Sequence, residues 1–306
     1  MKWIPIRGDF TLNDSKIVFN GGTDNVLGNI QTKQGLILSD QKMLAGKIKV
    51  DIEFETKDLQ INEEAELIFD YIDEYNFKCV GITGNTYKYE VKSCINGTWQ
   101  YLRASGFVPA LPKEKLHIEV DIMSSYLRLI IDGVEIFGAS LINPIRRSSI
   151  GIWTSGSRKI TFTDCKISFQ PPEVFIISQF GDIYDQLYDG VIKPLCDKNN
   201  IKPIRADEIS NSSVILDDII KYIQTANIII ADITPNNPNV FYELGYAHAI
   251  GKEVILLCER GKRAGLPFDI SGYRTIFYEN TMIGKDKIEK EVEKYLEEAL
   301  KRQGIL

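Results

Sequence analysis

Three polar side chains in the second half of the chain could do chemistry together: Asp232, Asn239 and Glu243. A carboxylate can stabilise a developing positive charge or trap it as a covalent ester. An amide can donate and accept hydrogen bonds in the same cavity. We therefore take these three residues as a candidate site for binding and converting a small polar ligand.

The elements that must hold these residues can be predicted from their surroundings. Residues 228–231 form an unbroken apolar run, which is typical of a strand buried on both faces of a parallel sheet. A helix is expected to begin after Asn237 as its cap and to end at Gly251. Ligands of open α/β sheets bind outside the carboxyl ends of the strands. We therefore expect the three side chains to converge there.

The rest of residues 172–306 alternates between strands and helices. Further strands are expected at 174–178, 202–206, 253–257 and 274–278, and helices up to about 199, at about 213–225 and at 286–302. This alternation predicts an α/β domain with a doubly wound parallel sheet of five strands. We expect its strand order to be the flavodoxin-like 2-1-3-4-5.

The first half consists of strands and turns. Strand-like runs occur at 17–20, 46–54, 65–71, 78–82, 88–93, 115–121, 126–131, 149–153 and 160–169. Asn96-Gly97 and Asp132-Gly133 lie between such runs, and both pairs are strong hairpin signals. The pattern predicts an all-β sandwich of the jelly-roll type. Pro171-Pro172 marks a boundary, so we expect one domain at 1–171 and a second at 172–306.

Composition argues against several classes of protein. The 306 residues carry a net charge of −6 and no basic stretch, which argues against binding duplex nucleic acid. Five scattered cysteines and two histidines suggest free thiols and no metal site. No stretch approaches the roughly 18 apolar residues of a membrane span, and we see no signal peptide. We expect a cytoplasmic protein without a cofactor and without membrane attachment.

The second half resembles the superfamily that joins nucleoside 2-deoxyribosyltransferases with TIR-like nucleotide-binding domains. The resemblance is carried by Phe175–Phe180, Arg205–Glu208, Ala231–Thr234 and Asn237–Ala249. Family enzymes break the N-glycosidic bond of nucleosides or of NAD with a helix glutamate, so the resemblance implies that Glu243 is catalytic. It also implies a nucleotide or nucleoside ligand and a homo-oligomer. Many relatives occur in bacterial anti-phage or nucleotide-signalling settings.

The expected roles follow the chemistry of base release. Departure of a base from a ribose leaves an oxocarbenium-like centre, which Glu243 could stabilise or trap. Asp232 is expected to hold the ribose or the base, and Asn239 to hydrogen-bond in the same cavity. Structural alternatives stay open for all three. Asp232 could only cap the turn that follows it, Asn239 could only start the helix, and Glu243 could be a solvated charge.

Four further residues complete the expected substrate site. Arg205 follows the second strand with Asp207 beside it, and could pair with a substrate phosphate in a bidentate fork. Its alternative is a surface ion pair with Asp207. Gln179 and Phe180 follow the first strand and could form the floor of the nucleobase pocket or stack on the base.

The first half resembles concanavalin-like or laminin-G-like jelly rolls. The order of features that carries this resemblance is Gly46–Phe54, Leu67–Tyr71, Gly97–Trp99 and Leu127–Gly133. Members often bind glycans and some are purely structural, so the resemblance implies a sensing or assembly domain with a glycan or protein ligand. Tyr71, Tyr75, Trp99 and Tyr101 could stack on a sugar, or they could be ordinary core and cross-strand aromatics.

Three functions remain open at this point. The first is cleavage of an N-glycosidic bond, with NAD as the first candidate substrate, by a defence effector that the first half gates. The second is a nucleotide sensor without turnover. The third is transfer of 2-deoxyribose between bases.

Overall fold

The computed structural model describes residues 1–13, 15–26, 28–107, 110–141, 143–208, 215–263 and 265–305. In these residues the chain divides into two units. Unit 1 lies within residues 1–170. Unit 2 consists of the chain from residue 171 onward together with two short segments of the first half, near residues 124 and 143.

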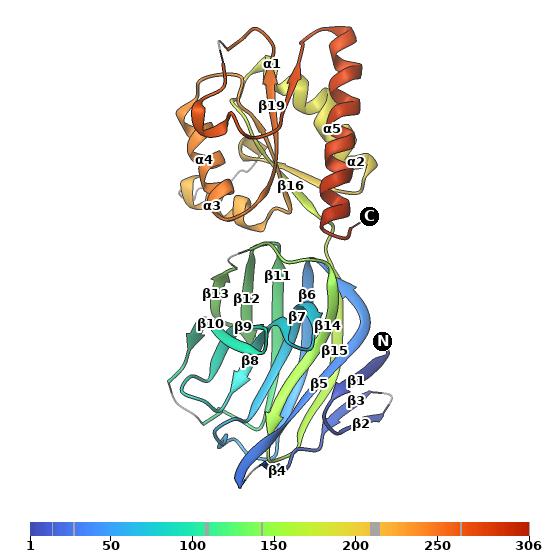
Figure 1. Cartoon of the computed structure of the whole chain (residues 1–306), viewed down its shortest axis with the longest axis vertical. Coiled ribbons are helices and arrows are strands. Elements are labelled where there is room, and N and C mark those ends of the chain that lie inside the picture. Colours follow the sequence, from blue (N-terminus) through green and yellow to red (C-terminus); the bar gives the residue numbers. More distant parts are fainter. Residues whose placement is uncertain are drawn as a thin grey trace. The chain divides into compact units, whose positions relative to one another are not determined.

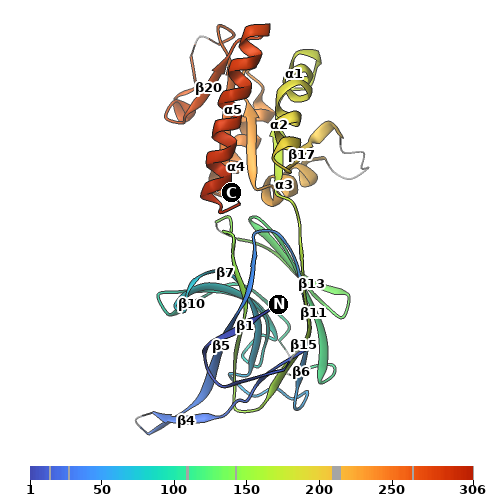
Figure 2. The ribbon, with the colours of Figure 1, turned by 90° about the vertical axis from the view of Figure 1, so that its right-hand side faces the viewer.

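Unit 1 is a sandwich of two antiparallel sheets, which Figure 2 shows as two layers. In the described residues, sheet A has the order β1 (Trp3–Arg7), β5 (Asn29–Met43), β14 (Ser148–Gly156), β7 (Glu64–Asp73), β8 (Asn76–Thr83), β9 (Tyr89–Ile95) and β10 (Thr98–Ser105), with β4 (Thr23–Val26) paired to β5. Sheet B has the order β13 (Val134–Ser140), β12 (Tyr126–Ile131), β11 (Lys115–Met123), β6 (Gly46–Phe54), β15 (Ile160–Phe169), β3 (Lys16–Phe19) and β2 (Phe10–Asn13). The predicted all-β sandwich is confirmed.

Strand β6 illustrates why these sheets form a sandwich. Ile48, Val50 and Ile52 are fully buried, whereas the alternating Lys47 and Lys49 are partly exposed. Successive side chains of a strand point to opposite faces, so one face of β6 joins the core and the other meets solvent. Burial of each such apolar side chain contributes about 1.5–3 kcal/mol.

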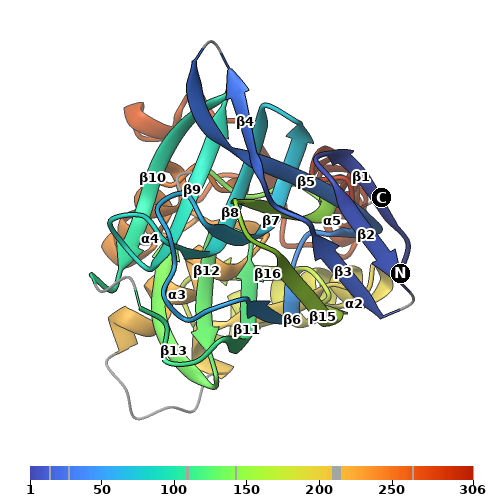
Figure 3. The same ribbon diagram turned by 90° about the horizontal axis from the view of Figure 1, so that it is seen from below.

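Two strands from the end of unit 1 lie inside the sheets. β14 pairs antiparallel with both β5 and β7. β15 pairs antiparallel with both β6 and β3, between which it lies in Figure 3. Each sheet is therefore joined through a strand that comes late in the chain of unit 1.

Both predicted hairpins are confirmed. Asn96 and Gly97 have φ values of 49° and 77° between β9 and β10. Asp132 and Gly133 have φ values of 49° and 81° between β12 and β13. Two successive residues with positive φ are typical of the type I′ turn, whose twist matches that of the flanking strands.

Several strands were not predicted from the sequence, and their positions in the sheets explain why. β1, β2, β10 and β13 lie at the ends of the two strand orders, and β4 pairs only with β5. Edge strands are less buried, so their hydrophobic alternation is weak. The 15-residue β5 was also missed, because its first half is polar and largely exposed. Pairing with β1, β4 and β14 fixes its conformation.

Unit 2 contains a parallel sheet with helices on both faces, as Figure 1 shows. In the described residues its order is β17 (Lys202–Arg205), β16 (Glu173–Ile177), β18 (Ile228–Asp232), β19 (Glu253–Glu259) and β20 (Thr275–Tyr278). All neighbouring pairs are parallel. The α/β architecture is confirmed, and the strands follow the order second, first, third, fourth and fifth that the sequence predicts.

The helices divide between the two faces. One face is covered by α1 (Asp182–Leu187), the π-helical turn η1 (Tyr188–Ile192), α2 (Lys193–Lys198) and α5 (Met282–Arg302), and the other by α3 (Ile215–Thr225) and α4 (Pro238–Ala249). Two 3-10 turns, η2 (Ala206–Glu208) and η3 (Phe268–Ile270), lie in connections. The first two residues of the helix predicted at 213–225 lie outside the described residues. In the described part of the chain, every helix is too short or too polar to cross a membrane.

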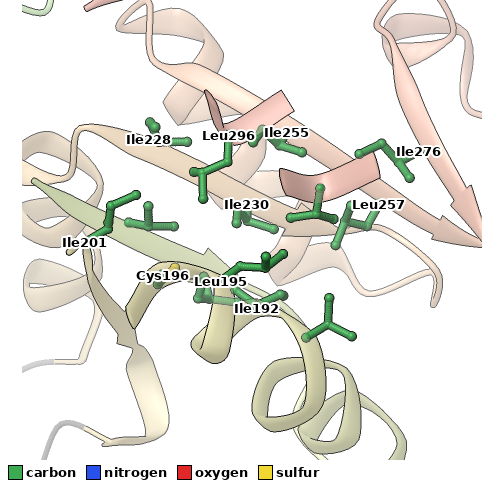
Figure 4. Packing of buried hydrophobic residues seen from close by; sticks show 14 of the residues in the cluster. Ile192, Leu195, Cys196, Ile201, Ile228, Ile230, Ile255, Leu257, Ile276 and Leu296 are labelled. Atoms are coloured by element: carbon green, nitrogen blue, oxygen red, sulfur yellow. The ribbon is translucent and has the colours of Figure 1, made fainter. Parts of the chain in front are cut away.

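Successive side chains of β18 point alternately into two apolar cores, one on each face of the sheet. Ile228 and Ile230 pack with Leu296 of α5 on one face, as Figure 4 shows. Ile229 packs with Leu244 of α4 on the other face. All five residues of β18 are buried, which is the burial expected of a central strand in a parallel sheet.

We expect residues 172–306 to fold without the first half, because the side chains of both apolar cores around the parallel sheet come from this segment. The fragment should show one cooperative transition when thermal unfolding is followed by circular dichroism. A fragment that stays unfolded until residues 1–170 are supplied would contradict this expectation.

Candidate functional site

Helix α4 is fixed by a cap at its start and a glycine after its end. The Asn237 side chain accepts a hydrogen bond from the backbone N–H of Asn239 at 3.0 Å, and Pro238 takes the first helical position. Gly251 has a φ of 71°, and its N–H donates to the carbonyl of His248. The predicted start and end of this helix are confirmed.

Glu243 lies in the second turn of α4 and is half-buried. Burial raises the pKa of its carboxyl to about 7. Among the residues that the structure describes, none donates a hydrogen bond to this side chain or pairs with it as a cation. Titratable groups perturbed in this way are concentrated at functional sites.

The surroundings of Glu243 follow from the geometry of α4. Asn239, Glu243 and Tyr246 share one flank, because residues three and four apart are neighbours on a helix surface. The Tyr246 hydroxyl accepts a hydrogen bond from the side chain of Gln224 in α3 at 2.6 Å. This flank therefore faces α3, and Glu243 and the exposed Asn239 lie together at its amino-terminal end, near the carboxyl end of the sheet.

Asp232 closes β18 and is 2% exposed. Its Oδ1 accepts hydrogen bonds from the backbone N–H of Thr234, at 2.9 Å, and from the Thr234 hydroxyl. Its Oδ2 accepts from the hydroxyl of Tyr278 at 2.8 Å. Burial raises the pKa of Asp232, and these three donors act against that rise. Both oxygens are thus engaged within the fold, in the turn-capping role that the sequence left open beside ligand binding.

The expected convergence of Asp232 with Glu243 is not found. Alternation along β18 sends Asp232 to the same face as Ile228 and Ile230, under α5, and its partner Tyr278 belongs to that core. Helix α4 covers the opposite face. Asp232 and Glu243 therefore lie at the same end of the sheet but on different sides of it.

Arg205 ends β17 as the buried centre of a charged and aromatic cluster. Its Nε donates to Asp207 at 2.7 Å, and its Nη2 donates to both Asp207 and Asp185, the latter at 2.7 Å. The guanidinium carbon lies 4.7 Å from the ring centroid of Tyr188 and 5.8 Å from that of Phe180. The ion pair expected between Arg205 and Asp207 is present, with the guanidinium buried and the carboxylate partly exposed. A second, partly exposed carboxylate, Asp185, extends it. The role of Arg205 toward a substrate phosphate stays a prediction.

The loop after β16 reaches the start of α4. The Gln179 side-chain oxygen accepts a hydrogen bond from the Asn237 amide at 3.5 Å. Phe180 is 52% exposed, so one face of its ring is free to stack on a planar ligand. The structure thus brings Gln179 to the α4 side of the site, and Phe180 to the cluster around Arg205.

Sequence reasoning missed two tyrosines that organise this end of the sheet. Tyr278 holds Asp232, and the Tyr188 hydroxyl donates to Glu208 at 3.0 Å. Tyr278 was assigned only to the fifth strand. Its position at a strand's carboxyl end, where the ends of parallel strands meet, was the available signal.

The arrangement of the remaining titratable side chains bears on metal binding. Within the described ranges, no group of three or more His, Cys, Asp and Glu side chains is arranged to hold a metal ion. The five cysteines are free thiols.

Comparison with known proteins identifies a related family for the second half. Residues 167–285 match the family model described as nucleoside 2-deoxyribosyltransferase. This segment includes Asp232, Asn239 and Glu243. A search of curated proteins gives no match.

Several solved structures resemble the chain at low identity. A carbohydrate-binding module from Bacillus subtilis has 12% identity and a TM-score of 0.43, over 53% of this chain and 92% of its own. A β-glucanase from Bacillus licheniformis has 14% identity and a TM-score of 0.37, over 55% and 92%. A galectin from Caenorhabditis elegans has 9% identity and a TM-score of 0.34, over 49% and 95%.

Tyr278→Phe should destabilise the protein, because it leaves one buried oxygen of Asp232 without its donor. An unsatisfied buried acceptor costs about 1–3 kcal/mol of unfolding free energy, which urea unfolding at neutral pH can measure. The matched control is Tyr242→Phe on the exposed side of α4, which should change stability little. Equal stabilities of the two variants would show that the hydrogen bond to Asp232 contributes nothing.

Proposed function

We propose that unit 2 cleaves the N-glycosidic bond of a nucleoside or nucleotide, with Glu243 as the carboxylate that faces the sugar. The observation that carries the proposal is the state of Glu243, which is half-buried, unpaired within the described chain, and has a pKa raised to about 7. The match of residues 167–285 to nucleoside 2-deoxyribosyltransferases supports the same class of reaction.

The proposed reaction begins with rupture of the bond between the anomeric carbon and the base nitrogen. The bonding electrons leave with the base, and the sugar becomes oxocarbenium-like. Ionised Glu243 stabilises this centre or forms an ester with it. Water then attacks the anomeric carbon, any ester bond to Glu243 breaks with its electrons returning to the carboxylate, and the proton lost by the water passes to the departed base or to solvent. Because the carboxylate is positioned before the reaction, its interaction strengthens as positive charge develops.

NAD is the first substrate to test, as the family resemblance suggests. A second candidate is transfer of 2-deoxyribose to another base, which the matched family's name supports. Hydrolysis and transfer differ in the group that attacks the sugar, which is water in the first and a second base in the other. A free acceptor base should therefore be incorporated only if the protein is a transferase. The homo-oligomer implied by the resemblance stays a prediction for both.

Glu243→Gln should abolish base release while leaving the fold intact. The change keeps the size of the side chain but removes the negative charge that the oxocarbenium-like centre requires. Loss of one preorganised electrostatic partner typically lowers the rate about 100- to 1,000-fold. The measurement is single-turnover release of free base from NAD and from a panel of nucleosides and nucleotides, read by chromatography.

The control for this variant is Glu291→Gln, an exposed glutamate of α5. It should release base at the wild-type rate. Unchanged release by the Glu243 variant would contradict the catalytic role. Binding of a nucleotide by the wild type without any release would favour the sensor alternative.

The rate of base release should also depend on pH through Glu243. The ionised carboxylate is the active form, so the rate should fall about tenfold per unit below its pKa of about 7. The contribution of Glu243 to the free energy of unfolding should change in the opposite direction, falling as pH rises. The folded-state pKa lies above the ordinary value of 4.5, so the stabilisation from protonated Glu243 is complete below that value and is lost as pH rises to about 7.

Glu243→Gln should remove that loss of stability. Melting temperatures of wild type and variant should diverge between pH 5 and pH 8, with the variant losing less. Parallel melting profiles, together with a pH-independent rate between pH 5 and pH 8, would show that the pKa of Glu243 lies outside this range.

A further inference from the structure

A cavity of about 310 Å³ lies between η1 and the start of α5 in unit 2. These two elements pack side by side, as Figure 2 shows, on the face of the parallel sheet opposite α4. Glu243 is not part of the lining, so the cavity is separate from the candidate site on α4. Its volume lies at the lower end of the range of about 300–1,000 Å³ that is usual for small-molecule sites.

The wall on the side of η1 follows from the backbone of that turn. Tyr188–Ile192 form a π-helical turn, a rare conformation that occurs frequently at functional sites. Gly190 lies at its centre, and a Cβ added there would meet only the end of the Lys285 side chain, 3.9 Å from its Nζ. The glycine thus leaves open a space that a larger residue would fill, and Lys285 reaches over that space.

The floor of the cavity is apolar. Val191, Tyr278 and Ile288 line it, and all three belong to the buried core on this face of the sheet. Leu187 also lines it and packs against the same core. Met282, the first residue of α5, completes the apolar lining and is 91% exposed. An apolar group of a few carbons would cover this floor and bury Met282, whose unbranched side chain adapts to irregular shapes.

The rim of the cavity carries one charge of each sign. Glu279 directly follows β20, Lys285 lies in the first turn of α5, and both line the cavity. Among the residues that the structure describes, neither side chain forms a hydrogen bond or an ion pair. Elsewhere between the same helices charges do pair, as Lys198 of α2 does with Glu293 of α5. The two rim charges are therefore available to a ligand.

Two free charges of opposite sign above an apolar floor define the chemistry of that ligand. A carboxylate pairs with the ammonium of Lys285, and an ammonium pairs with the carboxylate of Glu279. A ligand with only one charge would meet a like charge on the rim, which is unfavourable. A hydrocarbon would use neither charge, and an inorganic ion would leave the floor uncovered. A small zwitterion with an apolar side chain satisfies all three parts of the lining.

We propose that this cavity binds a free α-amino acid with an apolar side chain. The carboxylate of the amino acid lies against Lys285, its ammonium lies against Glu279, and its side chain lies on the apolar floor. Binding here requires no reaction at Glu243. The proposal therefore stands or falls independently of the N-glycosidic activity proposed for unit 2.

The test titrates the full chain with L-leucine, L-methionine and L-phenylalanine by calorimetry. At least one of them should bind with a Kd below about 1 mM, whereas glycine, which has no apolar side chain, should bind at least tenfold more weakly. Isocaproate and isoamylamine keep the apolar chain of leucine but lack its ammonium and its carboxylate, respectively. Each should bind about tenfold more weakly than leucine, because one rim charge then has no partner.

The variants Lys285→Gln and Glu279→Gln assign the two charges. Each should weaken leucine binding about tenfold. In Lys285→Gln, leucine and isoamylamine should bind alike, because the carboxylate of leucine has lost its partner. In Glu279→Gln, leucine and isocaproate should bind alike for the corresponding reason. The matched control is Lys290→Gln, an exposed lysine of α5 outside the lining, which should bind leucine as the wild type does.

The variant Gly190→Leu tests the place of the ligand. Its side chain should occupy the cavity and abolish binding, while the open space around Gly190 lets the fold accept it. A melting curve checks that the variant is folded. Because Lys285 and Glu279 are exposed, their variants keep the proposal testable even if Gly190→Leu does not fold.

Three results would overturn the proposal. The first is absence of binding by the wild type at about 10 mM of all three amino acids. The second is equal affinity of the wild type for leucine, isocaproate and isoamylamine, since the rim charges would then play no part. The third is leucine binding that Lys285→Gln and Glu279→Gln leave unchanged, since the amino acid would then lie elsewhere.

Discussion

Burial of β18 on both faces is the constraint on which unit 2 depends. Its side chains must alternate between two apolar cores, so each face needs its own helices. The same alternation places the Asp232 side chain on the face of the sheet where Tyr278 lies. Helix α4 packs on the other face. Asp232 anchors the turn at Thr234, and that turn leads directly to the Asn237 cap. A residue on one side of the sheet thus sets the start of the helix that carries Glu243 on the other.

Buried ionisable groups of two kinds occur in this protein, those that are paired and those that are not. In unit 1, Lys92 is enclosed by carboxylates, and the network holds its aromatic neighbours in place. In unit 2, Arg205 is likewise paired, with Asp185 and Asp207. Glu243 differs, because burial shifts its pKa and no described residue compensates it. Removing one partner of a buried pair leaves the other charge without compensation, whereas a perturbed group without a partner, such as Glu243, is a candidate for a functional site.

Local signals carried most of what could be predicted. The apolar run of β18, the Asn237 cap and Gly251 each act within a few residues, so the strand and the helix were found. The edge strands and the polar half of β5 carry no such signal, because distant partners fix them. Of the site, the positions of Glu243 and Asn239 on one helix were predictable. The partner of Asp232 was not, since Tyr278 is 46 residues away and only the fold brings it close.

The places of β14 and β15 have a consequence for synthesis of the chain. Both strands are completed only at residues 148–169, yet each joins the two parts of its sheet. During synthesis on the ribosome, β5 and β7 are therefore made before β14, which pairs with both of them. In the same way, β3 and β6 are made before β15. At about 5–20 residues per second, the interval from the first strands to β15 is on the order of 10–30 s. Throughout it these strands lack a partner that the finished sheets provide, and unpaired strand edges are prone to pair with other chains.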